Sequence, residues 1–299
     1  MVSKVDNTHD AALDYVQENI GYLLGPNLKT PDPALLGVLG INVVERMASA
    51  LSKVRGPREL GKLWASDIGE SCNRKLWMKF KDPGGEEPIP SHTQVKFIYG
   101  DLVEEIILYL MAEAGYKVSD RQHRVEKKLA GWTISGRIDA IINGRVVDVK
   151  STSSFGFKKY AGNTLEHADD TFGYIHQLNF YKNMLSDQTV GLAPKFIWVD
   201  KQLGKVQSGG SAIIAPAVMD LDLKYKFNAI ESKLIPAVPS HLLPELTTGG
   251  NSKLVTKCSY CGFKSKCFNY KTYLYSTGPI YLANVAKEPR VPMIGENAL

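Results

Sequence analysis

Two aspartates and a lysine near the middle of the 299-residue chain have the types and spacing for metal-assisted chemistry. The dipeptide Asn143-Gly144 favours a two-residue turn between two strands, and this turn places Asp139 directly opposite Asp148. Carboxylates that face each other across two strands repel unless a cation lies between them, and a divalent cation is the obvious candidate. Side-chain alternation along the strand then puts Lys150 on the same face as Asp148.

Such a face suits the hydrolysis of phosphodiester bonds. Mg²⁺ or Mn²⁺ takes oxygen ligands from carboxylates and phosphates, polarises the scissile phosphate and lowers the pKa of a water, while a nearby lysine orients that water or stabilises the developing charge. An acidic residue two positions before a lysine is common, and three more such tripeptides begin at Glu126, Asp222 and Glu231. Those three are expected on solvated faces, because only the tripeptide at Asp148 has an opposed aspartate.

A third acidic group is expected from a helix over about 95–114. On this helix Glu104 falls at the border of the apolar stripe, whereas its neighbour Glu105 lies nearly opposite and is expected in solvent. Gly100, one turn earlier, permits close approach of backbone or ligand. Glu104 is therefore a candidate metal ligand, although a glutamate at such a border is more often an ordinary surface residue.

A helix expected over about 171–185 carries Gln177 and Tyr181 on one face, because the two residues are four positions apart. Both side chains can hydrogen-bond to a site or to a DNA backbone. Such a pair is also common in plain packing, so its spacing leaves both interpretations open.

Four cysteines are placed for metal ligation. Cys258, Cys261 and Cys267 form a C-x2-C-x5-C cluster, and Cys72 lies far upstream. A disulfide framework is not expected in a cytosolic chain of this size, whereas close C-x2-C spacing favours a metal. Four thiolates suit Zn²⁺ as well as an iron–sulfur cluster. Either would close a very long loop, an effect on the order of 5 kcal/mol by analogy with disulfides.

The composition is that of an ordinary globular protein, with 44% hydrophobic and 22% charged residues. The sequence has no run of about 18 apolar residues, and its N-terminus is charged. We therefore expect a cytoplasmic protein without a membrane span or signal peptide. The net charge of +5 permits a polyanionic partner but is too small to indicate one.

The pattern along the chain predicts an α+β protein with an appended helical region. Residues 1 to about 60 read as helical and polar, a Pro/Gly/Glu-rich loop follows at 82–90, and the tail after Cys267 is expected to pack irregularly. The remaining elements are expected as strands over 118–129, 132–142, 145–150 and 195–200 and a helix over about 216–234. We divide the chain into a helical region (1–60), one domain (61–275) and a tail (276–299).

Read together, the motifs Gly100-x3-Glu104, Gly136-Arg137-Ile138-Asp139, Asp148-Val149-Lys150 and Gln177-x3-Tyr181 follow one another in this order. This series resembles the PD-(D/E)xK nuclease superfamily in its RecB-like branch. The cysteines narrow the resemblance: Cys72-Asn73-Arg74-Lys75 before these motifs and C-x2-C-x5-C after them look like the iron–sulfur nucleases typified by AddB and the CRISPR-associated RecB-like exonucleases. The similarity spans about 66–268.

The resemblance implies a restriction-endonuclease-like core, in which a central mixed β-sheet is flanked by helices. It also implies roles for the motif residues. Lys150 would be the catalytic lysine, and Gln177 and Tyr181 would support it and the DNA strand. The implied ligands of Mg²⁺ or Mn²⁺ are Glu104, Asp139, Asp148 and the Val149 carbonyl, and those of a [4Fe–4S] cluster are Cys72, Cys258, Cys261 and Cys267.

This chain departs from the family's pattern at two positions. Many relatives have histidine where Glu104 occurs, which makes ligation by Glu104 less secure than ligation by the two aspartates. Asn73 replaces the usual proline after the first cysteine and could alter the local turn.

The implied activity is that of a metal-dependent DNA exonuclease acting on single strands or duplex ends, in recombination, repair or phage DNA metabolism. DNA is the expected partner, within a bacterial or phage-infected cell, and a homo-oligomer or a recombination or replication partner remains open. The alternatives are a non-catalytic DNA-binding or scaffold module that keeps the cysteine-bound metal, and an endonuclease.

Overall fold

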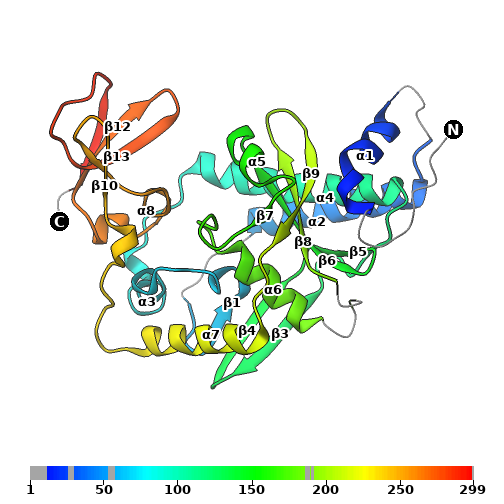
Figure 1. The fold of residues 1–299 in the computed structure, drawn as a ribbon, viewed down its shortest axis with the longest axis horizontal. Helices are drawn as coiled ribbons and strands as arrows, with labels where there is room; N and C mark the ends of the chain where they lie inside the picture. Colours follow the sequence, from blue (N-terminus) through cyan, green and yellow to red (C-terminus); the bar gives the residue numbers. More distant parts are fainter. Residues whose placement is uncertain (1–11, 26–29, 53–57, 186–188, 190–191, 298–299) are drawn as a thin grey trace. The chain divides into compact units, whose positions relative to one another are not determined.

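A computed structural model of the chain describes residues 12–25, 30–52, 58–185, 189 and 192–297, and it has an α+β fold (Figure 1). The chain forms two compact units. The first comprises 1–55, 62–69 and 90–220, and the second comprises 56–61, 70–89 and 221–299. The region expected as one domain over 61–275 is thus divided between the units, and the tail from 276 joins the second unit.

A six-stranded mixed sheet forms the centre of the first unit. Its order is β2-β5-β6-β8-β9-β7, with β6 parallel to β8 and antiparallel to β5. The strands are β2 (Val118–Ser119), β5 (Ala140–Ile142), β6 (Arg145–Thr152), β7 (Thr164–Leu165), β8 (Lys195–Asp200) and β9 (Val206–Ser211). A smaller sheet in the same unit has the order β1-β4-β3, from β1 (Lys62–Trp64), β4 (Trp132–Arg137) and β3 (Arg124–Leu129). The central mixed sheet confirms the expected fold class.

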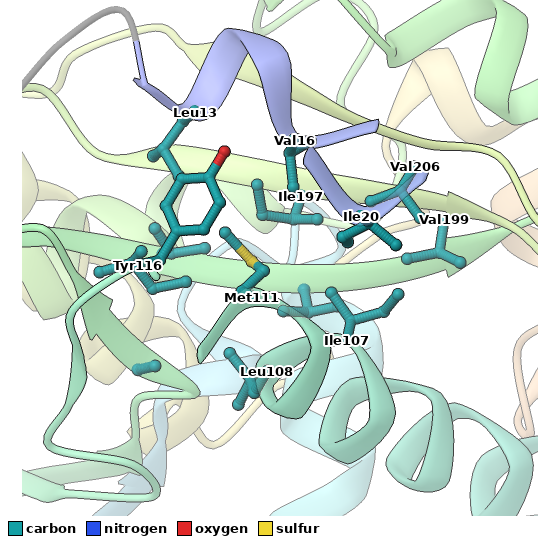
Figure 2. Packing of buried hydrophobic residues seen from close by; sticks show 14 residues of the cluster. Leu13, Val16, Ile20, Ile107, Leu108, Met111, Tyr116, Ile197, Val199 and Val206 are labelled. Atoms are coloured by element: carbon teal, nitrogen blue, oxygen red, sulfur yellow. The ribbon is translucent and has the colours of Figure 1, made fainter. Parts of the chain in front are cut away.

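Helices pack on this sheet through an apolar core. The helices of the first unit are α1 (Val16–Leu24), α2 (Pro33–Ser52), α4 (Ser91–Glu113), α5 (Ser154–Tyr160) and α6 (Tyr174–Met184). Figure 2 shows side chains of α1 and α4, among them Ile20 and Met111, converging on strand residues such as Ile197. Val147 and Val149 belong to the same buried cluster, which confirms that they point away from the face of Asp148.

Helix α2 differs from the polar helical segment that the sequence suggested. It is the one helix in the described ranges that is long and apolar enough to cross a membrane, with a mean hydropathy of 1.5. None of its described residues is fully buried, and it packs along α4. Length and composition alone are weak evidence for a membrane span, because core helices and signal sequences pass the same test.

The second unit holds α3 (Asn73–Lys81), most of α7 (Pro216–Glu231), α8 (Thr256–Ser259) and a five-stranded antiparallel sheet. The sheet has the order β10-β11-β13-β12-β14, from β10 (Glu245–Leu246), β11 (Ser252–Lys253), β12 (Tyr270–Tyr275), β13 (Gly278–Asn284) and β14 (Met293–Asn297). The expectation of an irregular tail is therefore wrong. Short 3-10 helices occur at Ala12–Tyr15, Ala65–Asp67, Pro83–Gly85, Ser240–Leu242 and Lys264–Lys266.

Candidate active site and cysteine cluster

The hairpin between β5 and β6 has the predicted turn. Asn143 and Gly144 have φ values of 51° and 76°, as the two central residues of a type I′ turn require. The pairs Ala140↔Val147, Ile141↔Val146 and Ile142↔Arg145 have the predicted register. The ladder ends there, however, one pair before Asp139 and Asp148.

Asp139 lies at a bend just outside the ladder, so it forms no strand pair with Asp148, and their direct opposition stays a prediction. Its Oδ2 accepts a hydrogen bond from the backbone N–H of Val149 at 2.7 Å, and its own carbonyl accepts one from the N–H of Gln122 at 3.2 Å. The chain bends because a carboxylate gains more from a backbone donor than from a second carboxylate. Burial and the negative charges of Glu104 and Asp148 raise the pKa of Asp139 well above its usual value.

Asp148 and Lys150 form the centre of the site. Asp148 is buried on β6, and its Oδ2 lies 2.6 Å from Lys150 Nζ. The ammonium group also lies 5.0 Å from the centroid of the Tyr174 ring, at the start of α6, in a cation–π contact. Burial alone would lower the pKa of Lys150, but Asp148 and Asp139 raise it above its usual value. The lysine is therefore held charged beside two carboxylates.

Glu104 reaches the same cluster from α4, where it is 8% exposed. Its Oε1 forms an ion pair with Arg46 Nη2 of α2 and accepts a hydrogen bond from Gln122 Nε2 at 2.8 Å. Burial raises the pKa of Glu104 to about 7 despite Arg46, and the negative charges of Glu105 and Asp148 add to the rise. The charge of Asp148 thus acts on Glu104, and the charges of Glu104 and Asp148 both act on Asp139, so the three acidic residues that the sequence singled out lie near one another.

Glu105 is not in solvent as the helix geometry suggested, but is 1% exposed. Its Oε1 accepts a hydrogen bond from Arg46 Nε at 3.1 Å, and its Oε2 accepts one from Asn42 Nδ2 at 3.2 Å and pairs with Arg121. The expectation failed because α2 covers this side of α4 with a cation and an amide.

Gln177 and Tyr181 share one face of α6 as predicted, and Gln177 Nε2 lies 3.1 Å from Tyr181 Oη. Tyr181 is buried against Gly136, where an added Cβ would lie 2.8 Å from the hydroxyl oxygen. Burial raises the pKa of Tyr181 to about 12, and the negative charges of Asp148 and Asp139 contribute. The pair therefore belongs to the surroundings of the acidic cluster.

No protein backbone among the described residues makes the close approach that Gly100 was expected to permit, and the approach of a ligand stays a prediction. A Cβ at this position would lie 3.6 Å from Ser151 Oγ, which is an ordinary van der Waals distance. The site leaves room for a methyl group at position 100.

In the described ranges of the chain, no set of three or more His, Cys, Asp or Glu side chains is arranged so that it could hold a metal ion. Lys150 lies against Asp148, Arg46 against Glu104, and the Val149 N–H against Asp139. The donor chemistry nevertheless fits a hard divalent cation, because Glu104, Asp139 and Asp148 offer carboxylate oxygens, and the negative charges of Glu104 and Asp148 raise the pKa of Asp139. The carbonyl of Val149 stays a predicted ligand.

The four cysteines all lie in the second unit. Cys72 is the N-cap of α3, where its Sγ accepts a hydrogen bond from the N–H of Lys75 at 3.4 Å. Burial raises the pKa of Cys258 to about 12, and the charges of Cys261 and Cys72 contribute. The thiols are thus close enough to influence one another, and this donor set fits a metal that takes thiolates.

Polar contacts link the segment around Cys72 to the segment that carries Cys258, Cys261 and Cys267. The carboxylate of Glu70 lies 2.8 Å from Lys75 Nζ and 3.0 Å from Lys257 Nζ. Although burial opposes ionisation, these two lysines hold the pKa of Glu70 at about 2. Arg74, two residues after Cys72, donates a hydrogen bond from Nε to Cys267 Sγ at 3.3 Å, so charged side chains link the two segments.

Sequence reasoning missed three residues that contact Glu104 or Lys150: Arg46, Gln122 and Tyr174. Arg46 offered one signal, since it and Glu45 are the only charged residues in the otherwise apolar segment Pro33–Ser52. Such a charge in an apolar helix needs a partner. Gln122 and Tyr174 offered none, because their positions depend on long-range packing.

No protein-family model matches the sequence, and no curated protein sequence matches it. The fold is similar to a solved structure titled "Crystal structure of SSO0001", with 16% sequence identity and a TM-score of 0.45. The match covers 77% of this chain and 96% of that chain. A likeness of this extent carries no argument about activity, ligand or partner.

Proposed function

We propose that the protein is a metal-dependent deoxyribonuclease. The observation that carries the proposal is the convergence of Glu104, Asp139 and Asp148 beside the charged Lys150 in the first unit. Neighbouring negative charges that raise a carboxyl pKa, as at Glu104 and Asp139, are costly to hold together, and such clusters occur where a protein binds cations or moves protons. A lysine held charged at the same point supplies the group that a phosphodiester hydrolase needs beside its carboxylates.

Each residue has a role in this proposal. Glu104, Asp139 and Asp148 would hold Mg²⁺ or Mn²⁺, which when bound polarises the scissile phosphate and lowers the pKa of a water. Lys150 is aimed by its contact with Asp148 and faces the negative charge that develops on the phosphate. Tyr174 limits the movement of the lysine by covering it with its ring.

Gln177 and Tyr181 have a supporting role. Their mutual hydrogen bond holds the two side chains together on one face of α6, where the negative charges of Asp148 and Asp139 act on Tyr181. Tyr181 keeps its proton at all ordinary pH values because its pKa is about 12. The hydroxyl group is therefore a hydrogen-bond donor toward the site or the strand, and not a base.

An aromatic residue beside the site supports single-stranded DNA as the substrate. Phe172 is 43% exposed, and its ring centroid lies 5.7 Å from that of Tyr174, which covers Lys150. The carboxylate of Asp170 accepts hydrogen bonds from three successive backbone N–H groups, those of 173–175, and so fixes the loop that carries Phe172. Exposed aromatic rings bind unpaired bases by stacking, whereas bases in a duplex are already stacked.

The four cysteines are proposed to hold a [4Fe–4S] cluster with a structural role, with Zn²⁺ as the alternative. Support comes from their common position in the second unit and from N–H groups directed at sulfur, including Arg74 Nε at Cys267. Such donors stabilise thiolates in either kind of centre.

A second candidate function is a non-catalytic DNA-binding module. The observation that favours it is the ion pairing of the acidic residues with the protein's own cations, Arg46 and Lys150. The two functions differ in one property, because only the nuclease turns over DNA when a divalent metal is added.

The test is cleavage of three DNA substrates with Mg²⁺ or Mn²⁺: an end-labelled single strand, a linear duplex and a closed circle. Wild type is compared with Asp148→Ala. The proposal predicts metal-dependent loss of the linear substrates by wild type alone. Equal activity of the two proteins would overturn it, and cutting of the closed circle would assign an endonuclease instead of an exonuclease.

A further inference from the structure

One arginine of α2 bridges the two glutamates of α4. Arg46 Nε donates to Glu105 Oε1 at 3.1 Å, and Nη2 pairs with Glu104 Oε1. The side chain of Arg46 is 20% exposed, whereas that of Glu105 is 2% exposed. The guanidinium therefore has a buried anchor at one end and a proposed metal ligand at the other.

The two ends of this bridge are not equivalent. Glu105 is also held by Arg121 and Asn42, so its charge and position are fixed independently of the metal site. Glu104 also accepts a hydrogen bond from Gln122, and it lies close enough to Asp148 for the negative charge of that residue to act on it. A divalent cation that binds Glu104 competes with Arg46 Nη2 for the same carboxylate, because two cations that share one anion repel each other.

We propose that Arg46 is a phosphate-binding residue of the nuclease site, held on Glu104 until a metal takes that carboxylate. The proposal rests on the proposed function. Nε keeps its hydrogen bond to Glu105, and the released Nη2 donates to a non-bridging oxygen of the bound DNA strand. The ligand is a phosphodiester, which a guanidinium recognises through paired N–H donors. No covalent bond changes in this exchange.

The exchange has an unusual consequence for variants of Arg46. Loss of the guanidinium removes a competitor of the metal, so metal affinity rises. Loss of the same group removes a contact to DNA, so DNA affinity falls when metal is present. A residue with a merely structural role would not separate the two affinities in this way, because disorder of Glu104 weakens both.

The experiment compares wild type, Arg46→Ala, Arg46→Lys and Arg121→Ala. Arg121→Ala is the matched control, since it removes an arginine that pairs with Glu105 and leaves the pair between Arg46 and Glu104 intact. Mn²⁺ affinity is measured by electron paramagnetic resonance without DNA. Binding of a fluorescent oligothymidylate is measured by anisotropy over a range of salt concentrations, with Ca²⁺ and with EDTA, and gels verify that the strand stays intact.

We expect Arg46→Ala to bind Mn²⁺ about tenfold more tightly, as the removal of one nearby charge allows. In Ca²⁺ its salt slope for the single strand should fall by about 0.7, the value of one phosphate contact, and in EDTA the slope should equal that of wild type. Arg46→Lys keeps the charge but not the paired N–H donors. Its Mn²⁺ affinity and its salt slope in Ca²⁺ should lie between those of wild type and Arg46→Ala. Arg121→Ala should keep the wild-type salt slope.

Weaker Mn²⁺ binding by Arg46→Ala, or an unchanged salt slope in Ca²⁺, would overturn the inference. These outcomes leave the proposed function intact provided that wild type binds Mn²⁺ and cleaves DNA. A wild-type protein that neither binds Mn²⁺ nor cleaves DNA would overturn both.

Discussion

The carboxylates of Glu104 and Asp139 bind protons more tightly in the folded chain than in solution. Burial raises the pKa of Glu104 to about 7, and burial together with Glu104 raises the pKa of Asp139. A raised carboxyl pKa means that the folded state binds more protons than the unfolded state between the two pKa values. For Glu104 this interval runs from 4.5 to about 7.

The free energy of unfolding of the metal-free protein should therefore fall as the pH rises through this interval, because ionisation is then costlier in the folded state. Urea unfolding with a chelator at pH 5, 6, 7 and 8 measures the slope. Glu104→Gln cannot ionise and should flatten it. A slope that is the same in both proteins would contradict the raised pKa of Glu104.

Several residues of the site could be predicted from the sequence alone. The turn at Asn143-Gly144 fixes the register of the hairpin, and side-chain alternation along β6 correctly placed Asp148 with Lys150. The charge of Arg46 in an apolar segment indicates that it needs a partner, but its partners could not be predicted, because they depend on α2 packing against α4, far away in the sequence. Glu105 was misplaced for the same reason: helix periodicity identifies a polar face but not what covers it.

At the scale of elements, α6 is positioned by an unusually close contact between two glycines. A Cβ at Gly69 would lie 2.2 Å from the carbonyl oxygen of Gly173, and Gly173 has a φ of 81° at the N-cap of α6. This contact places the start of the helix, and with it Tyr174, beside Lys150. The backbone at this point has no room for a side chain.

Gly69→Ala should therefore lower the free energy of unfolding by about 2–3 kcal/mol, as overpacking of a close contact does. Gly40→Ala is the control with the opposite sign, because an added Cβ there meets nothing within 4 Å and alanine favours the helix, by about 0.5–1 kcal/mol. Chemical denaturation measures both. Equal stability of Gly69→Ala and wild type would show that the helix start can move.

Elements were predictable where a local rule determined them. The strand expected over 195–200 agrees with β8, and the hairpin register agrees with the turn rule. The C-terminal strands could not be predicted, because Pro279 in β13 and Gly295 in β14 oppose strand formation locally. Pairing with neighbouring strands of the second unit outweighs that preference.

At the scale of the whole molecule, the division into two units explains why Cys72 is far away in the sequence from the other three cysteines. The chain leaves the second unit after residue 89 and returns to it at 221, so the first unit's main segment lies between the cysteine segments. A bound metal centre would close this long excursion and stabilise the second unit against unfolding.

Anaerobically purified protein should contain about four iron atoms per chain and be brown, as one [4Fe–4S] cluster requires. Cys261→Ser should lose the colour and unfold at a lower temperature, whereas Ser259→Ala should keep both properties. Metal analysis, visible absorption and thermal unfolding measure these outcomes. Stoichiometric zinc without colour would refute iron and assign a zinc centre.

The central claim is that Lys150 and the three carboxylates form a nuclease site, and the most direct measurement is the single-turnover rate of cleavage of an end-labelled single strand with Mn²⁺. Lys150→Ala should lower this rate by about 10²–10³-fold, the cost of losing one preorganised charge. Lys127→Ala, which removes a lysine paired with Asp220 elsewhere in the first unit, should leave it within about twofold. Equal rates for wild type and Lys150→Ala would contradict the account.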